Sequence, residues 1–200
     1  MVEHTLLATE IGRLVGIPFV SLLATRVVGK RFFEHLRSQL DNRPPDIVVK
    51  LSFTGVEVMD ASFSDEVFGT LAAHRARRED NFCPIILTDL NQTCRENLHM
   101  ALYTRIEREP ETLERLRNCV LPIVDELDLT LIGRFEDHVH ETFSILSSRG
   151  SLTARELSDV LHLNVNAAST RLKTLADLGL AFRVEIRDSV GKQYVYRSLI

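Results

Sequence analysis

Hydrophobic positions in the first two thirds of the chain form short apolar runs that alternate with stretches of helical spacing. An apolar run bounded by glycine, proline or turn residues predicts a strand, and apolar residues every three or four positions predict a helix. The alternation of the two predicts an α/β domain, residues 1–133, in which helices cover a sheet. The predicted strands are 17–24, 47–53, 84–88, 120–124 and 127–132, and the predicted helices cover 28–40, 63–71 and 98–106.

The helix over 63–71 has a predicted start at Ser62. A serine directly before an apolar helical stretch commonly caps the helix. Asp65 stands three residues later, where a capping box places its acidic partner. We therefore expect Ser62 to be the N-cap and Phe63, Val67 and Leu71 to face the core.

The last third of the chain predicts helix, helix, turn, helix and hairpin, in that order. The first helix covers 135–148, and the second begins at Thr153, which forms a capping box with Glu156. After Gly179, two alternating runs joined by the turn 188–191 predict a hairpin. This order indicates a winged helix-turn-helix (α+β) domain over residues 134–200.

The third helix of this domain separates a buried face from a polar one. Val165, Ala168, Leu172 and Leu175 recur at spacings of three and four, which predicts that all four face the core. The opposite face is rich in amides, hydroxyls and cations, and it has no acidic residue before Asp177. Amide and hydroxyl groups can read base edges, and cations can neutralise phosphates. We therefore expect DNA contacts from Asn164, Asn166, Ser169, Thr170, Arg171, Lys173 and Thr174, and from Arg187 and Lys192 beside the tip of the hairpin.

Residues 157–196, with the core ASTRLKTLADLGLA, resemble the winged helices of small bacterial repressors. The resemblance implies transcription regulation, usually by a homodimer on a palindromic DNA site. Winged helices also serve as protein-binding modules, so a role without DNA stays open.

Residues 48–71, VVKLSFTGVEVMDASFSDEVFGTL, resemble the STAS-like domain of bacterial regulators, which is related to anti-sigma-factor antagonists. In that family an Asp-Ser-Ser/Thr loop at a helix start docks on a partner kinase and is phosphorylated. The matching loop carries Ala61 at the usual acceptor position, and Asp65 and Glu66 would oppose a phosphate nearby. We therefore expect a role in dimerisation, ligand binding or partner sensing that needs no phosphorylation. The candidate partner or phosphorylation loop is Asp60, Ser62 and Ser64.

Charge is unevenly divided along the chain. The whole chain carries 24 basic and 28 acidic residues, a net charge of -4. From Gly150 onward there are seven basic and five acidic residues, against 17 and 23 before it. A mildly basic segment on an acidic body favours a DNA-binding module carried by a domain with another task.

Other chemistry finds little support in the sequence. The three cysteines, at 83, 94 and 119, match no zinc-ligand spacing, which favours buried thiols in a reducing compartment. His138 and His140, two apart on a helix, point in different directions and cannot close on one ion. No phosphate-binding glycine loop and no set of nucleophile and base occurs. We expect no enzyme activity, no metal and no cofactor.

Two hypotheses follow. The first is a cytoplasmic DNA-binding transcription regulator in which a STAS-like domain senses a partner or small ligand, with no membrane contact, because neither a leader nor a membrane-length apolar run is apparent. The alternative is a partner-switching adaptor in which both domains bind proteins and the hairpin touches no DNA.

Overall fold

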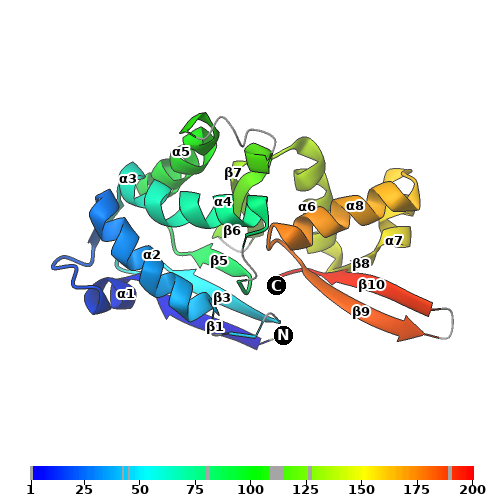
Figure 1. The fold of residues 1–200 in the computed structure, drawn as a ribbon, viewed down its shortest axis with the longest axis horizontal. Coiled ribbons are helices and arrows are strands. Elements are labelled where there is room, and N and C mark those ends of the chain that lie inside the picture. Colours follow the sequence, from blue (N-terminus) through cyan, green and yellow to red (C-terminus); the bar gives the residue numbers. More distant parts are fainter. Residues whose placement is uncertain are drawn as a thin grey trace. The chain divides into compact units, whose positions relative to one another are not determined.

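The computed structural model describes residues 2–41, 43–44, 46–79, 82–108, 115–125, 128–188 and 191–200. The chain divides into two compact units, Met1–Phe135 and Glu136–Ile200. Helices and strands alternate in the first unit, whereas the second has three helices followed by a long hairpin (Figure 1). Among the described residues, no helix combines the length and the apolar character needed to cross a membrane.

The first unit is a mixed α/β structure built on a mostly parallel five-stranded sheet in the order β1-β3-β5-β6-β7. Neighbouring strands from β1 to β6 are parallel, and β7 closes one edge antiparallel to β6. A separate parallel pair consists of β2 (Leu22–Leu23) and β4 (Val58–Met59). The five strands are β1 (Val2–Leu7), β3 (Ile47–Ser52), β5 (Ile85–Thr88), β6 (Cys119–Asp125) and β7 (Asp128–Arg134).

The three helices predicted for this unit are present, and a short additional helix precedes them. A continuous helical segment follows β4, in which α3 passes through the π-helical turn η1 into α4. The helices are α1 (Ala8–Leu14), α2 (Arg26–Asp41), α3 (Ala61–Ser64), η1 (Asp65–Gly69), α4 (Thr70–Arg77) and α5 (Gln92–Arg108), with a short 3-10 turn η3 (Arg115–Asn118).

Aromatic side chains from the helices pack in the core of the first unit. The rings of Phe32 and Phe63 pack edge to face with centroids 5.1 Å apart, so that α2 and α3 meet through them. Helix α5 approaches β7 closely at Gly133, whose φ is +114°. A Cβ at this position would collide with the carbonyl oxygen of Cys119, so the sequence needs glycine there.

One predicted strand of the first unit is much shorter in the structure, and an edge strand was not predicted. The strand predicted over 17–24 is reduced to Leu22–Leu23, because Pro18 has no backbone N–H to donate and the Phe19 side chain, 72% exposed, has no core to enter. Strand β1 was not predicted, because it lies at the edge of the sheet and its exposure does not alternate. Leu127, the predicted start of the last strand, lies outside the described residues.

The second unit contains the predicted helices and hairpin, with one short strand between the first two helices. Helices α6 and α7 both pack against α8. The strands form an antiparallel sheet in the order β8-β10-β9. The elements are α6 (Asp137–Arg149), β8 (Ser151–Thr153), α7 (Ala154–Leu161), α8 (Val165–Asp177), β9 (Phe182–Asp188) and β10 (Gly191–Arg197).

The predicted capping box at the start of α7 is confirmed. The hydroxyl oxygen of Thr153 accepts a hydrogen bond from the Glu156 amide at 3.2 Å, and the Glu156 carboxylate accepts one from the Thr153 amide at 2.7 Å. The hydrogen bonds that the Thr153 amide and then the Thr153 hydroxyl donate to the carboxylate hold the pKa of the Glu156 carboxyl below its ordinary value. The helix ends at His162, which has a left-handed φ of 53° and begins the turn into α8.

Candidate nucleic-acid interface

Helix α8 presents a polar stripe to solvent. Ala168, Leu172 and Leu175 are fully buried, as predicted. Val165 is 47% exposed, so the prediction that it faces the core is wrong: it is the first residue of the helix, directly after the N-cap Asn164. The exposed polar residues of the helix recur at positions i, i+3, i+4 and i+7, and they are Asn166, Ser169, Thr170 and Lys173.

The hydroxyls on this helix are oriented by its backbone. Thr170 donates to the Asn166 carbonyl oxygen at 2.9 Å, and Thr174 donates to the Thr170 carbonyl oxygen at 3.0 Å. Each hydroxyl proton is therefore used within the helix, while the oxygen lone pairs stay available to accept. The Asn166 side chain adds an amide that can both donate and accept. The stripe can thus satisfy the mixed donor and acceptor pattern of a base edge.

Asn164 has a structural task at the start of α8. Its side-chain oxygen accepts a hydrogen bond from the Ala167 amide at 2.8 Å, which makes Asn164 the N-cap of the helix. Asn164 therefore has a capping role in addition to its predicted DNA contact, for which its side-chain nitrogen can still donate. Thr174, at the other end of the predicted set, is only partly exposed.

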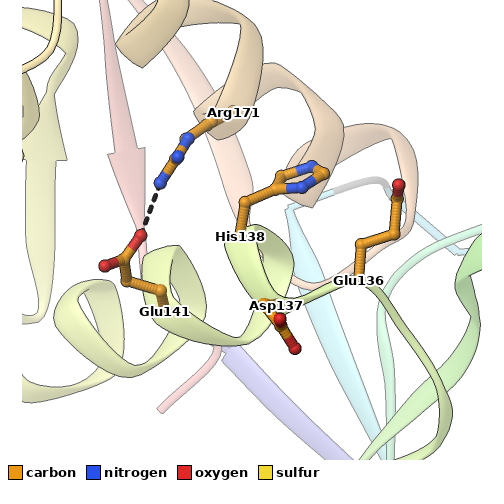
Figure 2. Close-up of a pocket in the computed structure, with 5 residues that line it drawn as sticks. All are labelled: Glu136, Asp137, His138, Glu141 and Arg171. Atoms are coloured by element: carbon orange, nitrogen blue, oxygen red, sulfur yellow. Dashed lines mark hydrogen bonds and ion pairs between the residues drawn. The ribbon is translucent and has the colours of Figure 1, made fainter.

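Arg171 lies on the flank of the stripe and is held by an acidic residue of another helix. Its guanidinium donates to the carboxylate of Glu141 on α6 at 2.6 Å (Figure 2). The pair borders a surface hollow of about 610 Å³, whose other lining residues are Glu136, Asp137 and His138. Arg171 is thus placed in an acidic surrounding, and a phosphate could reach it only in competition with Glu141.

Most cations of the hairpin lie on one face, where an acidic residue joins them. Arg187 and Lys192 lie directly opposite one another in the register of β9 and β10. The Glu185 carboxylate receives Lys192 at 2.6 Å and Arg187 at 3.1 Å. The hydrogen bond from Lys192, followed by that from Arg187, lowers the pKa of Glu185, and the contact with Glu185 raises the pKa of Lys192. Ser189 and Val190, in the predicted turn, lie outside the described residues.

Three residues of this surface were not predicted. Arg183 stacks on the ring of Tyr194, with its guanidinium carbon 3.6 Å from the ring centroid. Arg183 and Glu185 could have been found from the period of two in β9, which places them on the face of Arg187. Glu141 could not, because it stands 30 residues from Arg171 and no local spacing relates the two.

The second unit begins at Glu136, so its net charge differs from that of the segment that begins at Gly150. The segment Glu136–Ile200 includes Glu136, Asp137, Glu141 and Arg149, all of which precede Gly150. With them the unit has eight basic and eight acidic residues and is neutral. Cations therefore act locally on this unit, through the places where they gather, and its total charge gives no attraction for a polyanion.

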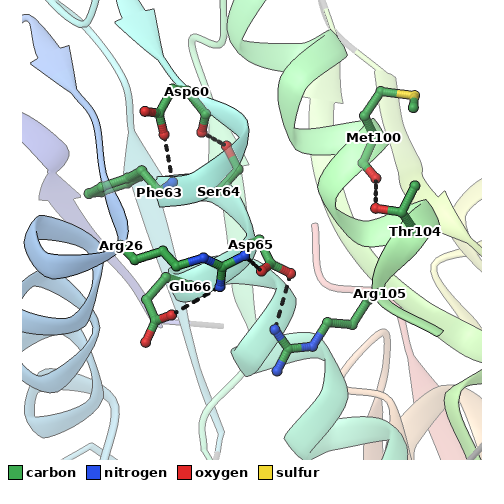
Figure 3. A network of polar contacts seen from close by, with 9 residues as sticks. All are labelled: Arg26, Asp60, Phe63, Ser64, Asp65, Glu66, Met100, Thr104 and Arg105. Carbon is green, nitrogen blue, oxygen red and sulfur yellow. Dashed lines mark hydrogen bonds and ion pairs between the residues drawn. The ribbon is translucent and has the colours of Figure 1, made fainter. Parts of the chain in front are cut away.

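In the first unit, Asp60 caps α3, so the prediction of Ser62 as N-cap is wrong. One carboxylate oxygen of Asp60 accepts from the Phe63 amide at 2.6 Å (Figure 3). The other accepts from the Thr25 amide at 3.0 Å. The helix begins two residues earlier than predicted because a carboxylate at Asp60 satisfies amides at the starts of both α2 and α3.

The other residues of this loop have different environments. Ser62 is exposed, whereas Ser64 is fully buried and donates to the Asp60 carbonyl oxygen at 2.8 Å. Asp65 is no capping partner: its buried carboxylate receives Arg26 of α2 at 2.8 Å and Arg105 of α5 at 3.0 Å, from two sides (Figure 3). Ser62 is therefore the serine of the predicted loop that a partner could reach.

In the described part of the chain, the residue types that bind metals do not cluster, and the cysteines are buried. No three histidine, cysteine, aspartate or glutamate side chains among those residues gather as metal ligands would. The three cysteines are buried free thiols, as predicted, and burial raises the pKa of Cys83 and Cys94.

No protein-family model matches the sequence, and no curated protein matches it either. The function must therefore be inferred from the residues of the chain itself. Those residues offer an exposed polar helix face, a hairpin with cations on one side and an exposed loop serine in the other unit.

Proposed function

We propose that this chain is a DNA-binding transcription regulator, in which residues 136–200 act as a winged helix-turn-helix with α8 as recognition helix and β9–β10 as wing. The observation that carries the proposal is the exposed stripe of Asn166, Ser169, Thr170 and Lys173, which has no acidic member. An α-helix fits the major groove of B-form DNA, where amides and hydroxyls can distinguish base pairs.

The contacts can be assigned by chemistry. Asn166 can bond an adenine edge through both ends of its amide, and the Ser169 and Thr170 hydroxyl oxygens can accept from base amino groups. Lys173, at the end of the stripe, suits a phosphate. The wing brings Arg183, Arg187 and Lys192 to the flank, where they suit the backbone or the minor groove.

For the first unit we propose a STAS-like sensing role in the cytoplasm. The mostly parallel sheet and the exposed Ser62 after β4 support a domain that meets a partner or a small ligand. Pairing of two copies would place two α8 helices on half-sites about one helical turn apart, which is how helix-turn-helix dimers gain affinity.

The first test selects bound sequences from a random duplex library and then measures affinity for the selected DNA across a salt series. We expect a common sequence to emerge and log K to fall linearly with log salt concentration, as counterions are released from phosphates. Absence of any selected sequence, together with equal affinity for random duplex, would contradict the proposal.

Two substitutions divide the stripe by role. Asn166→Ala should lose about 1 to 3 kcal/mol of discrimination at one base pair. Lys173→Ala should weaken binding to all sequences alike and reduce the salt slope by about one. Lys30→Ala, an exposed lysine on α2 of the first unit, is the matched control and should change neither quantity. If Lys173→Ala and Lys30→Ala bind DNA with the same affinity and the same salt slope, the result would contradict a place for α8 in the interface.

The neutral charge of the second unit favours one alternative, a partner-switching adaptor that binds proteins through both units. That function predicts no DNA binding even at low salt, where non-specific binding to basic proteins is strongest. The same library experiment at low salt therefore separates the two functions.

A further inference from the structure

Three of the cations predicted to contact DNA phosphates are engaged by carboxylates within the chain. Arg171 is bound by Glu141, and Arg187 and Lys192 are both bound by Glu185. Lys173 differs from them, because no ion pair of its side chain occurs among the residues described here. Of the four cations that the sequence predicts to contact phosphates, Lys173 is therefore accessible and the other three are occupied by carboxylates.

We propose that Glu141 and Glu185 are intramolecular competitors of the DNA phosphates and set the affinity of this surface below what its cations could reach. The inference rests on the proposed function, since it concerns the regulation of the same interface. Each carboxylate occupies the guanidinium or ammonium group that a phosphate oxygen would contact.

The geometry at Arg171 makes the competition direct. The contact with Glu141 is a short charge-assisted hydrogen bond of 2.6 Å between helices α8 and α6. Glu136 and Asp137 line the same hollow, so an arriving phosphate meets further negative charge there. Arg171 can contact DNA only after it leaves Glu141 and turns away from this acidic side of α6.

On the hairpin one carboxylate restrains two cations. Glu185 lies two residues from Arg187 along β9 and across the ladder from the residues of β10, so it reaches both Arg187 and Lys192. All three side chains are well exposed, so the pairs can open when phosphates offer a better partner. The hairpin therefore approaches DNA with a carboxylate between its two cations.

The competition by Glu141 and Glu185 should make the affinity for DNA depend less steeply on salt concentration. A free cation that contacts a phosphate of B-form DNA adds about 0.9 to the magnitude of the slope of log K against log salt. A cation that first leaves a carboxylate adds less, because the released carboxylate takes up a counterion as the DNA loses one. The wild-type slope should thus be shallower than the number of cations at the interface suggests.

The experiment compares the full chain with Glu141→Gln, Glu185→Gln and the double variant, on the DNA selected by the wild type and, if none is selected, on random duplex at low salt. Glutamine keeps the size of the side chain and removes its charge. We expect each single variant to bind on the order of fivefold tighter, the double variant more so, and the slope to steepen by up to about one for Glu141→Gln and two for Glu185→Gln.

Glu34→Gln is the matched control, because it removes one negative charge from an exposed position on α2 of the first unit. It should leave both affinity and slope unchanged, and a thermal melt checks that all variants fold. Wild-type binding with unchanged affinity and slope in the Glu141 and Glu185 variants would overturn the inference and leave the proposed function standing. Absence of binding by the wild type and by every variant would reject the proposed function and the inference together, whereas binding by the variants alone would support both.

Discussion

Glu185 is a single side chain that determines how much unpaired positive charge the hairpin surface presents. On β9 it stands among cations, accepts hydrogen bonds from two of them and shares the hairpin face with the Arg183–Tyr194 stack. Its charged form is favoured by these contacts, which is why its pKa is lowered. At neutral pH the carboxylate is therefore ionised and paired.

We predict that Glu185 titrates below the ordinary range of a glutamate in the full chain, as followed by carboxyl chemical shifts in an NMR pH series. Lys192→Gln removes the largest cause of the shift and should raise the midpoint toward the ordinary value. Lys30→Gln should leave it in place. As the pH falls through the lowered pKa, the pairs with Lys192 and Arg187 are lost, since the protonated carboxyl carries no charge. A midpoint that does not respond to Lys192→Gln would show that the pair does not form in solution.

The roles of single residues are harder to predict from the sequence than the helices and strands that contain them. Ser62 and Asp60 are both acceptable N-caps, and the choice depends on Thr25, 35 residues earlier, whose amide needs the second oxygen of Asp60. Val165 fits the buried period of its helix but is its first residue and is 47% exposed. In the case of Asp60, a contact between residues distant in sequence accompanies the choice of cap.

At the scale of elements, the caps are the clearest determinants of where helices begin. Thr153 makes both reciprocal bonds of a capping box with Glu156, whereas Ser62 accepts no capping bond at the start of α3, where Asp60 has that role. The two residues therefore provide a matched pair of hydroxyl side chains, one that caps a helix and one that does not.

We predict that Thr153→Ala lowers the free energy of unfolding of the second unit by about 1 kcal/mol, because an amide at the start of α7 loses its acceptor. The same change should raise the pKa of Glu156 part of the way toward its ordinary value, since it removes the hydrogen bond from the Thr153 hydroxyl and keeps the one from the Thr153 backbone amide, which is the larger cause of the shift. Ser62→Ala should change the stability of the first unit by less than about 0.5 kcal/mol. Hydrogen exchange of amides in each unit measures the two effects separately, and a larger loss at Ser62 would contradict the cap assignment.

Elements were predictable in proportion to their length and burial. The helical period identified α2, α5, α6 and α8, because each buries one face along several turns. Strands β1 and β8 were missed for the opposite reason: β1 is an exposed edge, and β8 has three residues that pair only with β10. Alternation cannot be read from so few positions or from a strand that lacks a buried face.

At the scale of the molecule, each unit has its own core, and we expect each to fold alone. Residues 136–200 should therefore fold as a fragment, which circular dichroism and amide NMR can verify. On the proposed function, the fragment should retain the sequence preference of the full chain and bind about 100-fold or more weakly, because it loses the pairing of two half-sites. A fragment that binds as tightly as the full chain would show that the first unit contributes nothing to affinity.

The carboxylate held between Arg187 and Lys192 also has a consequence for how this protein could change over generations. In most binding surfaces, substitution of a contact residue weakens the complex or leaves it nearly unchanged. Here, on the proposed function, replacement of Glu185 by any neutral residue releases two cations at once and strengthens it. If the proposed function holds, a change in one codon would raise or lower the affinity for DNA and leave unchanged the residues of α8 proposed to contact bases.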